Sequence, residues 1–470
     1  MIEGLKPYAE YKESGQQWLG GIPAHWDLKP GHAAFAPRKE SNRGMKEKTV
    51  LSLSYGRIKV KATDKQHGLV PESYETYQIV NEGNIIIRGT DLQNDHTSLR
   101  MGLSHDRGII SSAYLCLEAQ PRIAPEYGYQ ILNVFDLTKA IYRYGSGLRQ
   151  NLDHGEIKRL PIFLPPLDEQ AAIVRFLDYT NRKIDGFIRA KRKLIGLLNE
   201  QKQAIIHRAV TRGLDPNAKL KPSGIPWLGE IPEHWEFPRV KQCARKISKG
   251  TTPSTEGREI LDSGPVRFLK AENISAGRIT DKPLCFIDEE TNRVIRRSQL
   301  EENDILFVIA GATLGKTAVV SGDVLPANTN QACAFIRPNK RVMPRFLELW
   351  LQSPRIKELI WLNAVQSAQP NLSMADLGNF VCPVPPIDEQ EAILSYVERE
   401  SDPLNTAIAR TEREIALMQE YRTRLTADIV TGKLDVREAA AKLPETDASE
   451  AEEPLAGEFE EELEIKEEES

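Results

Sequence analysis

Basic side chains are the residues of this sequence best suited to chemistry, and they gather in two separate stretches. Lys and Arg neutralise phosphate groups, and one arginine can donate two hydrogen bonds to a guanine base. Any single one is equally well explained as a solvated surface charge, but as two sets they favour contact with a polyphosphate. The first stretch contains Arg57, Lys59, Lys61, Lys65, Arg88 and Arg100, and the second contains Arg245, Lys246, Lys249, Lys270, Arg278 and Arg293.

Two short polar segments contain a second kind of candidate, amide side chains near the end of each half. The segment YGSGLRQNLD includes Gln150 and Asn151, and the segment QSAQPNLSM includes Gln369 and Asn371. An amide offers a donor and an acceptor together, which is the combination that pairs with the edge of adenine. Asn residues are also common in turns. The sequence leaves both interpretations open.

The glycine-rich segment GATLGKT, residues 311–317, follows an apolar run and resembles a phosphate-binding loop. That loop needs four residues between its first glycine and the Gly-Lys pair, and this segment has three. We therefore predict a turn that leaves Lys316 available to a DNA phosphate. A P-loop ATPase is the weaker alternative.

Residue patterns for other chemistries are missing from the sequence. The five cysteines lie far apart without a CxxC pair, and the eight histidines never pair at metal-ligand spacing. The Asn/Asp-Pro-Pro-Tyr/Phe motif of amino-methyltransferases is absent, and no clear carboxylate–carboxylate–lysine pattern of a nuclease is found. We predict no catalytic residue and no metal site, and isolated buried thiols in a reducing cytosol.

The charge of the chain is unevenly distributed. The net charge is −5, but residues 444–470 contain thirteen acidic residues and one lysine, so the remaining residues carry +7. A mildly basic body suits a polyanionic partner. The acidic segment has few large apolar residues and is predicted to be disordered. It is either a solubilising tail or a competitor of DNA for the basic face.

Two sequence repeats divide the chain into halves. WLGGIPAHW at 18–26 matches WLGEIPEHW at 227–235 at seven of nine positions. LPPLDEQAAI at 164–173 matches VPPIDEQEAI at 384–393 at seven of ten. The residues between these repeats are nearly unrelated. The pattern indicates one scaffold that presents two different surfaces, in which the histidines and tryptophans of the first repeat have packing roles.

A long helix is predicted after each Pro-Pro pair. Apolar residues there recur in alternating steps of four and three, which is typical of a coiled-coil seam. Asp168 is expected to cap the first helix, which would be roughly 60 Å long at 1.5 Å per residue. Pro403 predicts a kink or a restart in the second. The seam is predicted to contain Ile173, Leu177, Ile184, Leu194, Leu198 and Ile205 of the first helix, and Ile393, Val397, Leu404, Met418 and Leu425 of the second.

The variable middles are predicted to be mixed α/β structure. Residues 81–90 and 302–312 show a turn followed by a strand at comparable places in the two halves. Residues 108–120 and 330–339 are predicted to be later strands of the same sheet. Residues 343–360 have the pattern of one amphipathic helix.

The paired tryptophan cassettes, the paired PP-(L/I)-D-E-Q helix openings and the two heptad helices together resemble the specificity subunit of type I restriction–modification enzymes. The resemblance covers residues 5–435. It implies an α+β fold with two target-recognition domains in pseudo-twofold arrangement, separated by two long helices that form an antiparallel coiled coil. The implied parts are recognition domains at 1–165 and 216–385, helices at 166–215 and 386–435, and a disordered acidic tail at 436–470.

The same resemblance implies a non-catalytic protein of the bacterial or archaeal cytoplasm that binds a bipartite, asymmetric site in double-stranded DNA. The implied partners are two methyltransferase (modification) subunits and motor-nuclease (restriction) subunits, with no membrane. S-adenosylmethionine, ATP and Mg²⁺ are expected in those partners and no cofactor in this chain. The alternative from another class is a coiled-coil scaffold that binds no DNA.

Overall fold

The structure is a computed structural model of the whole chain. It divides into two compact units, and each unit combines one predicted module with one end of each long helix. Unit 1 comprises residues 1–190 and 414–470, and unit 2 comprises residues 191–413. The residues described are 5–16, 18–54, 56–61, 73–90, 92–93, 98–144, 151–225, 228–275, 277–311, 313–364 and 371–444.

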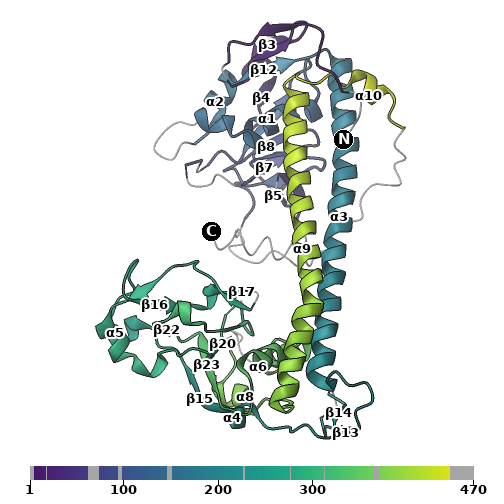
Figure 1. Cartoon of the computed structure of the whole chain (residues 1–470). Helices are drawn as coiled ribbons and strands as arrows, with labels where there is room; N and C mark the ends of the chain where they lie inside the picture. The colour runs from purple at the N-terminus through teal and green to yellow at the C-terminus, as the bar shows by residue number, and fades with distance from the viewer. Residues whose placement is uncertain are drawn as a thin grey trace. The chain divides into compact units, whose positions relative to one another are not determined.

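Both units contain a four-stranded antiparallel sheet with the same strand order. In each sheet the first strand along the chain pairs with the fourth, the fourth with the second, and the second with the third. The strands predicted at 81–90 and 302–312 are confirmed as the second strands of these sheets. The order is β4 (Phe35–Pro37), β11 (Leu115–Ala119), β8 (Ile85–Ile87) and β9 (Met101–Leu103) in unit 1, and β15 (Ala244–Lys249), β23 (Cys333–Pro338), β20 (Ile305–Val308) and β21 (Thr317–Val319) in unit 2. Figure 1 labels β4 and β8 of the first sheet, and β15, β20 and β23 of the second.

The segments inserted into the two sheets differ. In unit 1 the hairpin β5 (Leu51–Ser54) to β6 (Arg57–Val60) and the pair β7 (Gln78–Val80) with β10 (Gly108–Ile110) are added. The expectation that all of 108–120 belongs to the main sheet is therefore wrong for β10. Unit 2 adds β16 (Val266–Leu269), β17 (Ile274–Ser275), β18 (Arg278–Ile279), β19 (Phe286–Ile287), α5 (Glu289–Val294) and β22 (Ala327–Thr329).

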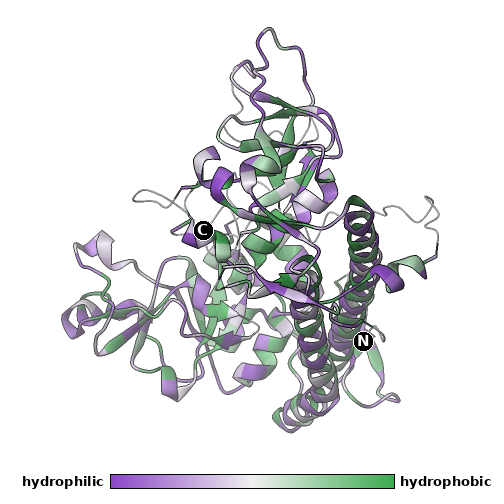
Figure 2. Ribbon diagram, turned by 90° about the horizontal axis from the view of Figure 1, so that it is seen from above, coloured by the Kyte–Doolittle hydropathy of each residue, from purple (hydrophilic) through white to green (hydrophobic). Residues whose placement is uncertain are grey.

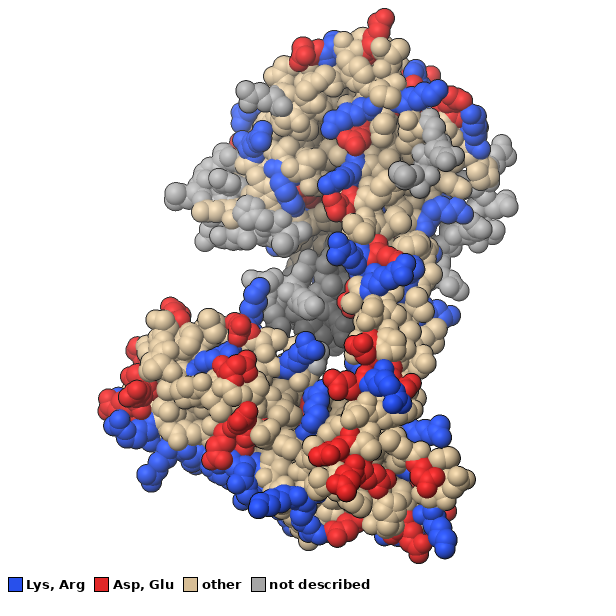
Figure 3. Space-filling view, in the orientation of Figure 1, with Lys and Arg blue, Asp and Glu red and all other residues tan. Residues whose placement is uncertain are grey.

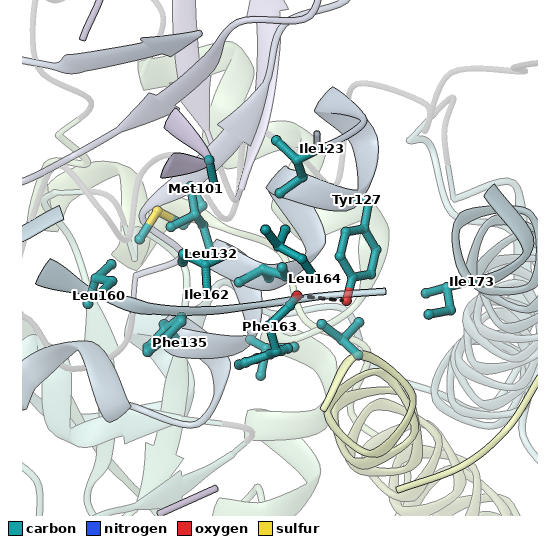
Figure 4. Close-up of a cluster of buried hydrophobic side chains, with 14 of the residues drawn as sticks. Met101, Ile123, Tyr127, Leu132, Phe135, Leu160, Ile162, Phe163, Leu164 and Ile173 are labelled. Atoms are coloured by element: carbon teal, nitrogen blue, oxygen red, sulfur yellow. Dashed lines mark hydrogen bonds between the residues drawn. The ribbon is translucent and has the colours of Figure 1, made fainter. Parts of the chain in front are cut away.

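Helices cover the sheets and begin at prolines. In unit 1, α1 (Pro125–Leu137) packs beside β12 (Pro161–Leu164), and Tyr127 donates a hydrogen bond to the carbonyl of Phe163 at 3.3 Å (Figure 4). Unit 2 has α6 (Pro344–Leu351) followed by α7 (Pro354–Ala364). The single helix predicted over 343–360 is wrong, because a proline fits the first turn of a helix and not its interior.

The two long helices are α3 (Leu167–Arg212) and α9 (Ile387–Val430), and they pair antiparallel within each unit. In unit 1, Arg422 of α9 donates a hydrogen bond to Asp185 of α3. In unit 2, Lys202 of α3 donates to the side-chain oxygen of Asn405 at 2.8 Å. The predicted helix pairing is confirmed. Figure 2 shows hydrophobic and hydrophilic residues alternating as stripes along both helices.

Burial along the helices corrects part of the predicted seam. Leu194 is 40% exposed, so its place in the seam is wrong. After Ile184 the protected positions include Ile188, Lys191, Ile195 and Leu198, again in steps of four and three, so the heptad spacing is kept with Ile195 in place of Leu194. The other predicted members are buried (Ile173, Leu177, Ile184, Ile393, Val397, Leu425) or half-buried (Leu198, Ile205, Leu404, Met418).

Three further predictions need correction. Asp168 lies inside the first turn of α3 and does not precede it, so it is not the cap. Pro403 lies within α9, which continues through it without the predicted restart. The short helix α10 (Arg437–Ala441), with Ala440 buried in the core of unit 1, lies where the predicted tail begins. Residues 445–470 lie outside the described part of the chain. Among the residues that the structure describes, no helix is long and apolar enough to span a membrane.

Candidate nucleic-acid interface

The histidine and tryptophan of the first cassette are anchored to the start of α3. Glu169 is 2% exposed and accepts hydrogen bonds from Tyr8 Oη (2.5 Å), His25 Nε2 (2.8 Å) and Trp26 Nε1 (2.9 Å). Burial, followed by the hydrogen bond to Glu169, raises the pKa of Tyr8 well above its ordinary value. The tyrosine therefore stays neutral and remains a donor.

The second cassette is anchored in the same way. Glu389 accepts from His234 Nε2 at 2.8 Å and from Trp235 Nε1 at 3.1 Å. The next residue of each helix opening is also equivalent. Gln170 accepts from the main-chain N–H of Ala124, and Gln390 accepts from that of Met343, so each glutamine holds the residue just before α1 or α6.

These contacts explain both repeats together. The cassette supplies the donors, and the Asp-Glu-Gln opening supplies the acceptors that fix the sheet and its helix to the long helix. The sequence suggested packing for His25 and His234 and helix-end roles for the carboxylates. It did not show that the two motifs bond to each other.

We expect the substitution Glu169→Gln to destabilise unit 1. An amide keeps one acceptor but directs an N–H toward a group of donors, which costs roughly 1.5–3 kcal/mol of unfolding free energy. Urea unfolding followed by tryptophan fluorescence measures the change, because Trp26 lies in the network. Glu200→Gln, at an exposed position of α3, is the matched control. Equal unfolding midpoints for the two variants would contradict the anchoring role.

One end of each sheet brings together several of the predicted DNA contacts, and we call it the reading end. In unit 2 the N–H of Val308 donates to the carbonyl of Lys316, and the N–H of Leu372 donates to that of Ile309. In unit 1 the N–H of Arg88 donates to the carbonyl of Arg100, and the N–H of Leu152 donates to that of Gly89. The residues before the two leucines, Asn151 and Asn371, are both exposed and occupy equivalent places.

The reading end of unit 2 presents Lys316, Asn371 and Lys249, all exposed. Strand pairing places Lys249 opposite Ala334, which lies opposite Phe307 and next to the loop that carries Lys316. The loop enters strand β21 directly, whereas a phosphate-binding loop enters a helix, so the geometry gives the ATPase alternative no support.

The other predicted residues of unit 2 lie elsewhere. Arg245 donates to the carbonyl of Pro338 and Lys246 to that of Arg297, at the far end of β15. Figure 3 shows Lys and Arg gathered along this edge of unit 2, near β15 and α4 (Val240–Cys243), so charge alone does not locate the reading end. Lys270 is half-buried, Arg278 and Arg293 are exposed, and Gln369 lies outside the described residues.

In unit 1 the hairpin β5–β6 brings basic residues beside the reading end. Arg57 is exposed and lies 3.5 Å from Asp185 of α3. Lys59 and Arg88 are half-buried, Lys61 is exposed, and Lys65 and Gln150 lie outside the described residues. Gly56, beside Arg57, packs against Leu99 of the loop that ends at Met101.

The prediction that Arg100 contacts DNA needs correction. Arg100 occupies the place that Lys316 has in unit 2, but it is 0% exposed, and its guanidinium donates to the carbonyls of Arg88 (3.3 Å) and Thr90 (2.7 Å). Its charge is used to hold the loop, so a DNA contact by Arg100 is not supported.

Sequence reasoning missed Lys39, an exposed residue at the end of β4. Burial, and then the positive charge of Lys39, lower the pKa of His154, which lies three residues after Asn151. Strand pairing places Pro37 opposite Leu117 and Ile87 opposite Leu115, so Lys39 follows β4 at the reading end of unit 1, where Lys249 lies in unit 2. It lies outside the basic clusters, so only the strand order reveals it. Among the described residues, no three His, Cys, Asp or Glu side chains are arranged to bind a metal ion.

Comparison with known proteins identifies similar sequences and a similar fold. The family described as "Type I restriction modification DNA specificity domain" matches residues 232–416. The EcoBI specificity subunit of Escherichia coli is 28% identical, over 61% of this chain and 64% of its own length. The MjaVIII specificity subunit of Methanocaldococcus jannaschii is 25% identical, over 70% and 75% respectively. A solved structure from a study of assembly and conformational transition in the type I R-M system matches the fold with a TM-score of 0.60 at 15% identity, covering 87% of this chain and 98% of that one.

Proposed function

We propose that this chain is the DNA-recognition subunit of a type I restriction–modification enzyme. The premise is that the chain belongs to the family of type I restriction–modification specificity subunits. Its two reading ends would each contact one part of a bipartite target in double-stranded DNA. The two parts differ in sequence, so the target is asymmetric.

The observation that carries the proposal is one strand order with two unlike reading ends. Unit 1 places Lys39 and Asn151 there, and unit 2 places Lys249, Lys316 and Asn371. Contacts to phosphates fix a protein on the duplex, and contacts to base edges select the sequence. A shared frame with different side chains therefore suits a protein that reads two different sequences. A scaffold that binds only proteins would have no need for exposed lysines at this one end of both sheets.

The proposed partners supply the chemistry. Two modification subunits would bind S-adenosylmethionine and methylate adenine, and the restriction subunits would use ATP and Mg²⁺ for movement and cleavage. The chain itself would be non-catalytic, act in the cytoplasm, and choose where its partners act. The long helices would set the unread spacer between the two half-sites.

Mapping of methylated adenines in host DNA, with and without this gene, tests the proposal. We expect one bipartite, asymmetric motif to lose its methylation when the gene is deleted and to regain it on complementation. An unchanged methylation pattern, in a strain whose modification subunit is expressed, would overturn the proposal and favour the scaffold alternative.

Asn371 and Asn151 provide a finer test. If each amide pairs with an adenine edge, Asn371→Ala should relax one base position in one half-site, at a cost of about 1–3 kcal/mol in discrimination. Asn151→Ala should do the same in the other half-site. Binding to duplexes with single substitutions measures both effects. Loss of affinity without any change in base preference would show that the amides only hold turns.

A further inference from the structure

Three cationic side chains of unit 2 lie near one another, on elements far apart in the sequence. They are Lys202 of α3, Arg278 of β18 and Arg345 of α6, and we call them the cation cluster. The core of unit 2 brings α3 to α6, because Ile206, one turn after Lys202, is buried there together with Phe346, which follows Arg345. Lys202 is half-buried and donates a hydrogen bond to the neutral amide of Asn405 at 2.8 Å. No described carboxylate forms an ion pair with Lys202 or Arg278.

Local backbone geometry holds the cluster together. The turn between β17 and β18 contains Gly277, with a φ of 75°, a conformation that favours glycine. A β-carbon at Gly277 would lie 3.0 Å from Gln352 Nε2 and 3.6 Å from a guanidinium nitrogen of Arg345. The absence of a side chain at Gly277 therefore lets this turn rest on α6 and brings Arg278 beside Arg345.

The same contacts connect the cluster to the reading end. Glu348 is 0% exposed, pairs with Arg345, and accepts from the hydroxyl of Thr317 at 3.1 Å. Thr317 follows Lys316 directly in the chain. Glu348 is thereby occupied by Arg345 and Thr317, and it offers no free carboxylate to the other two cations.

The charges in the cluster are not balanced by the protein. Burial, together with the positive charges of Arg345 and Arg278, lowers the pKa of Lys202. With Glu348 offsetting Arg345, two positive charges remain. Holding them together costs free energy, which an anion with several acceptor oxygens would offset.

We propose that the cation cluster binds a backbone phosphate of DNA next to the half-site read by unit 2. The inference rests on the proposed function and extends it, because it makes Lys202 of the long helix part of the DNA-binding surface. Lys202 and Arg278 contact the phosphate oxygens, and Arg345 stays oriented by Glu348. The contact fixes position along the duplex and carries no sequence information.

Salt-dependent DNA binding by the full chain tests the inference. Each lost phosphate contact should reduce the slope of log K against log salt by about 0.9. We expect this reduction for Lys202→Gln and for Arg278→Gln, with equal weakening on the mapped target and on unrelated duplex. Lys340→Gln is the matched control, because Lys340 is exposed and lies beyond the opposite end of β23. Added inorganic phosphate tests whether the cation cluster binds only the free ion and not DNA. In that case phosphate would protect the chain against heat, and the two substitutions would leave the salt slope of DNA binding unchanged.

The outcomes separate the two proposals. A wild-type chain that does not prefer the mapped target over unrelated duplex overturns the proposed function and the inference with it. If the wild-type chain shows the preference, but Lys202→Gln and Arg278→Gln give the same salt slope as Lys340→Gln, only the inference is overturned. Melting temperatures show whether the variants are folded. Lys202→Gln should melt at or above the wild-type temperature, because it removes repulsion between the positive charges of the cluster.

Discussion

Exchanging residues 217–380 for the second module of another family member changes one half of the DNA target and leaves the other half intact. The exchanged segment contains the whole sheet of unit 2 with its reading end, including Lys249, Lys316 and Asn371. It contains nothing of the sheet of unit 1. Because discrimination depends on side chains that reach base edges, the new half-site should be that of the donor protein. Methylated-adenine mapping in cells that carry the chimaera measures the result.

The donor must satisfy one structural condition. Glu389 lies outside the exchanged segment and bonds to His234 and Trp235 inside it. A donor with His-Trp at these positions keeps the anchor, and a chimaera with both replaced by alanine is the control for a misassembled module. A change in both halves of the target, in a chimaera that keeps the anchor, would contradict independent reading by the two units.

The sequence predicted the frame better than the reading ends, for physical reasons. Repeated motifs such as the cassette and the Asp-Glu-Gln opening are visible because both copies must make the same hydrogen bonds to Glu169 or Glu389. In the described residues of the two middles, no such polar anchor recurs in sequence. Their common strand order depends on backbone pairing, which many apolar sequences satisfy. The equivalence of Arg88 with Val308 was therefore invisible before the hydrogen bonds were known.

The exposure of individual charges also depends on tertiary context. Arg100 and Lys316 stand at the same place in the frame, but one is buried against carbonyls and the other is exposed. No local pattern separates them, because the carbonyls that bind Arg100 belong to Arg88 and Thr90, which lie 12 and 10 residues away in the sequence. Leu194 failed for a different reason. Leu194 and Ile195 are neighbouring apolar residues, and the periodicity of the sequence does not choose between them, whereas the structure protects Ile195.

The long helices are expected to act as a ruler, and lengthening both should lengthen the unread spacer of the DNA target. Asp185 lies opposite Arg422, and Lys202 lies opposite Asn405. Both contacts give the same antiparallel register, which places Leu194 opposite Arg413. We therefore propose to insert one heptad after Leu194 and one after Glu412.

Seven residues add about 10.5 Å of helix, which corresponds to roughly three base pairs, and rotate the helix by only about 20°. We expect the half-sites to stay the same and the spacer to grow by about three base pairs, as read from the methylated motif. A heptad in α3 alone is the control, because it moves Lys202 away from Asn405 and mismatches the paired apolar faces, so methylation should be lost. If the doubly lengthened chain still methylates sites with the original spacer, the helices do not measure the distance between the half-sites. The spacing would then be set by contacts within the partner subunits.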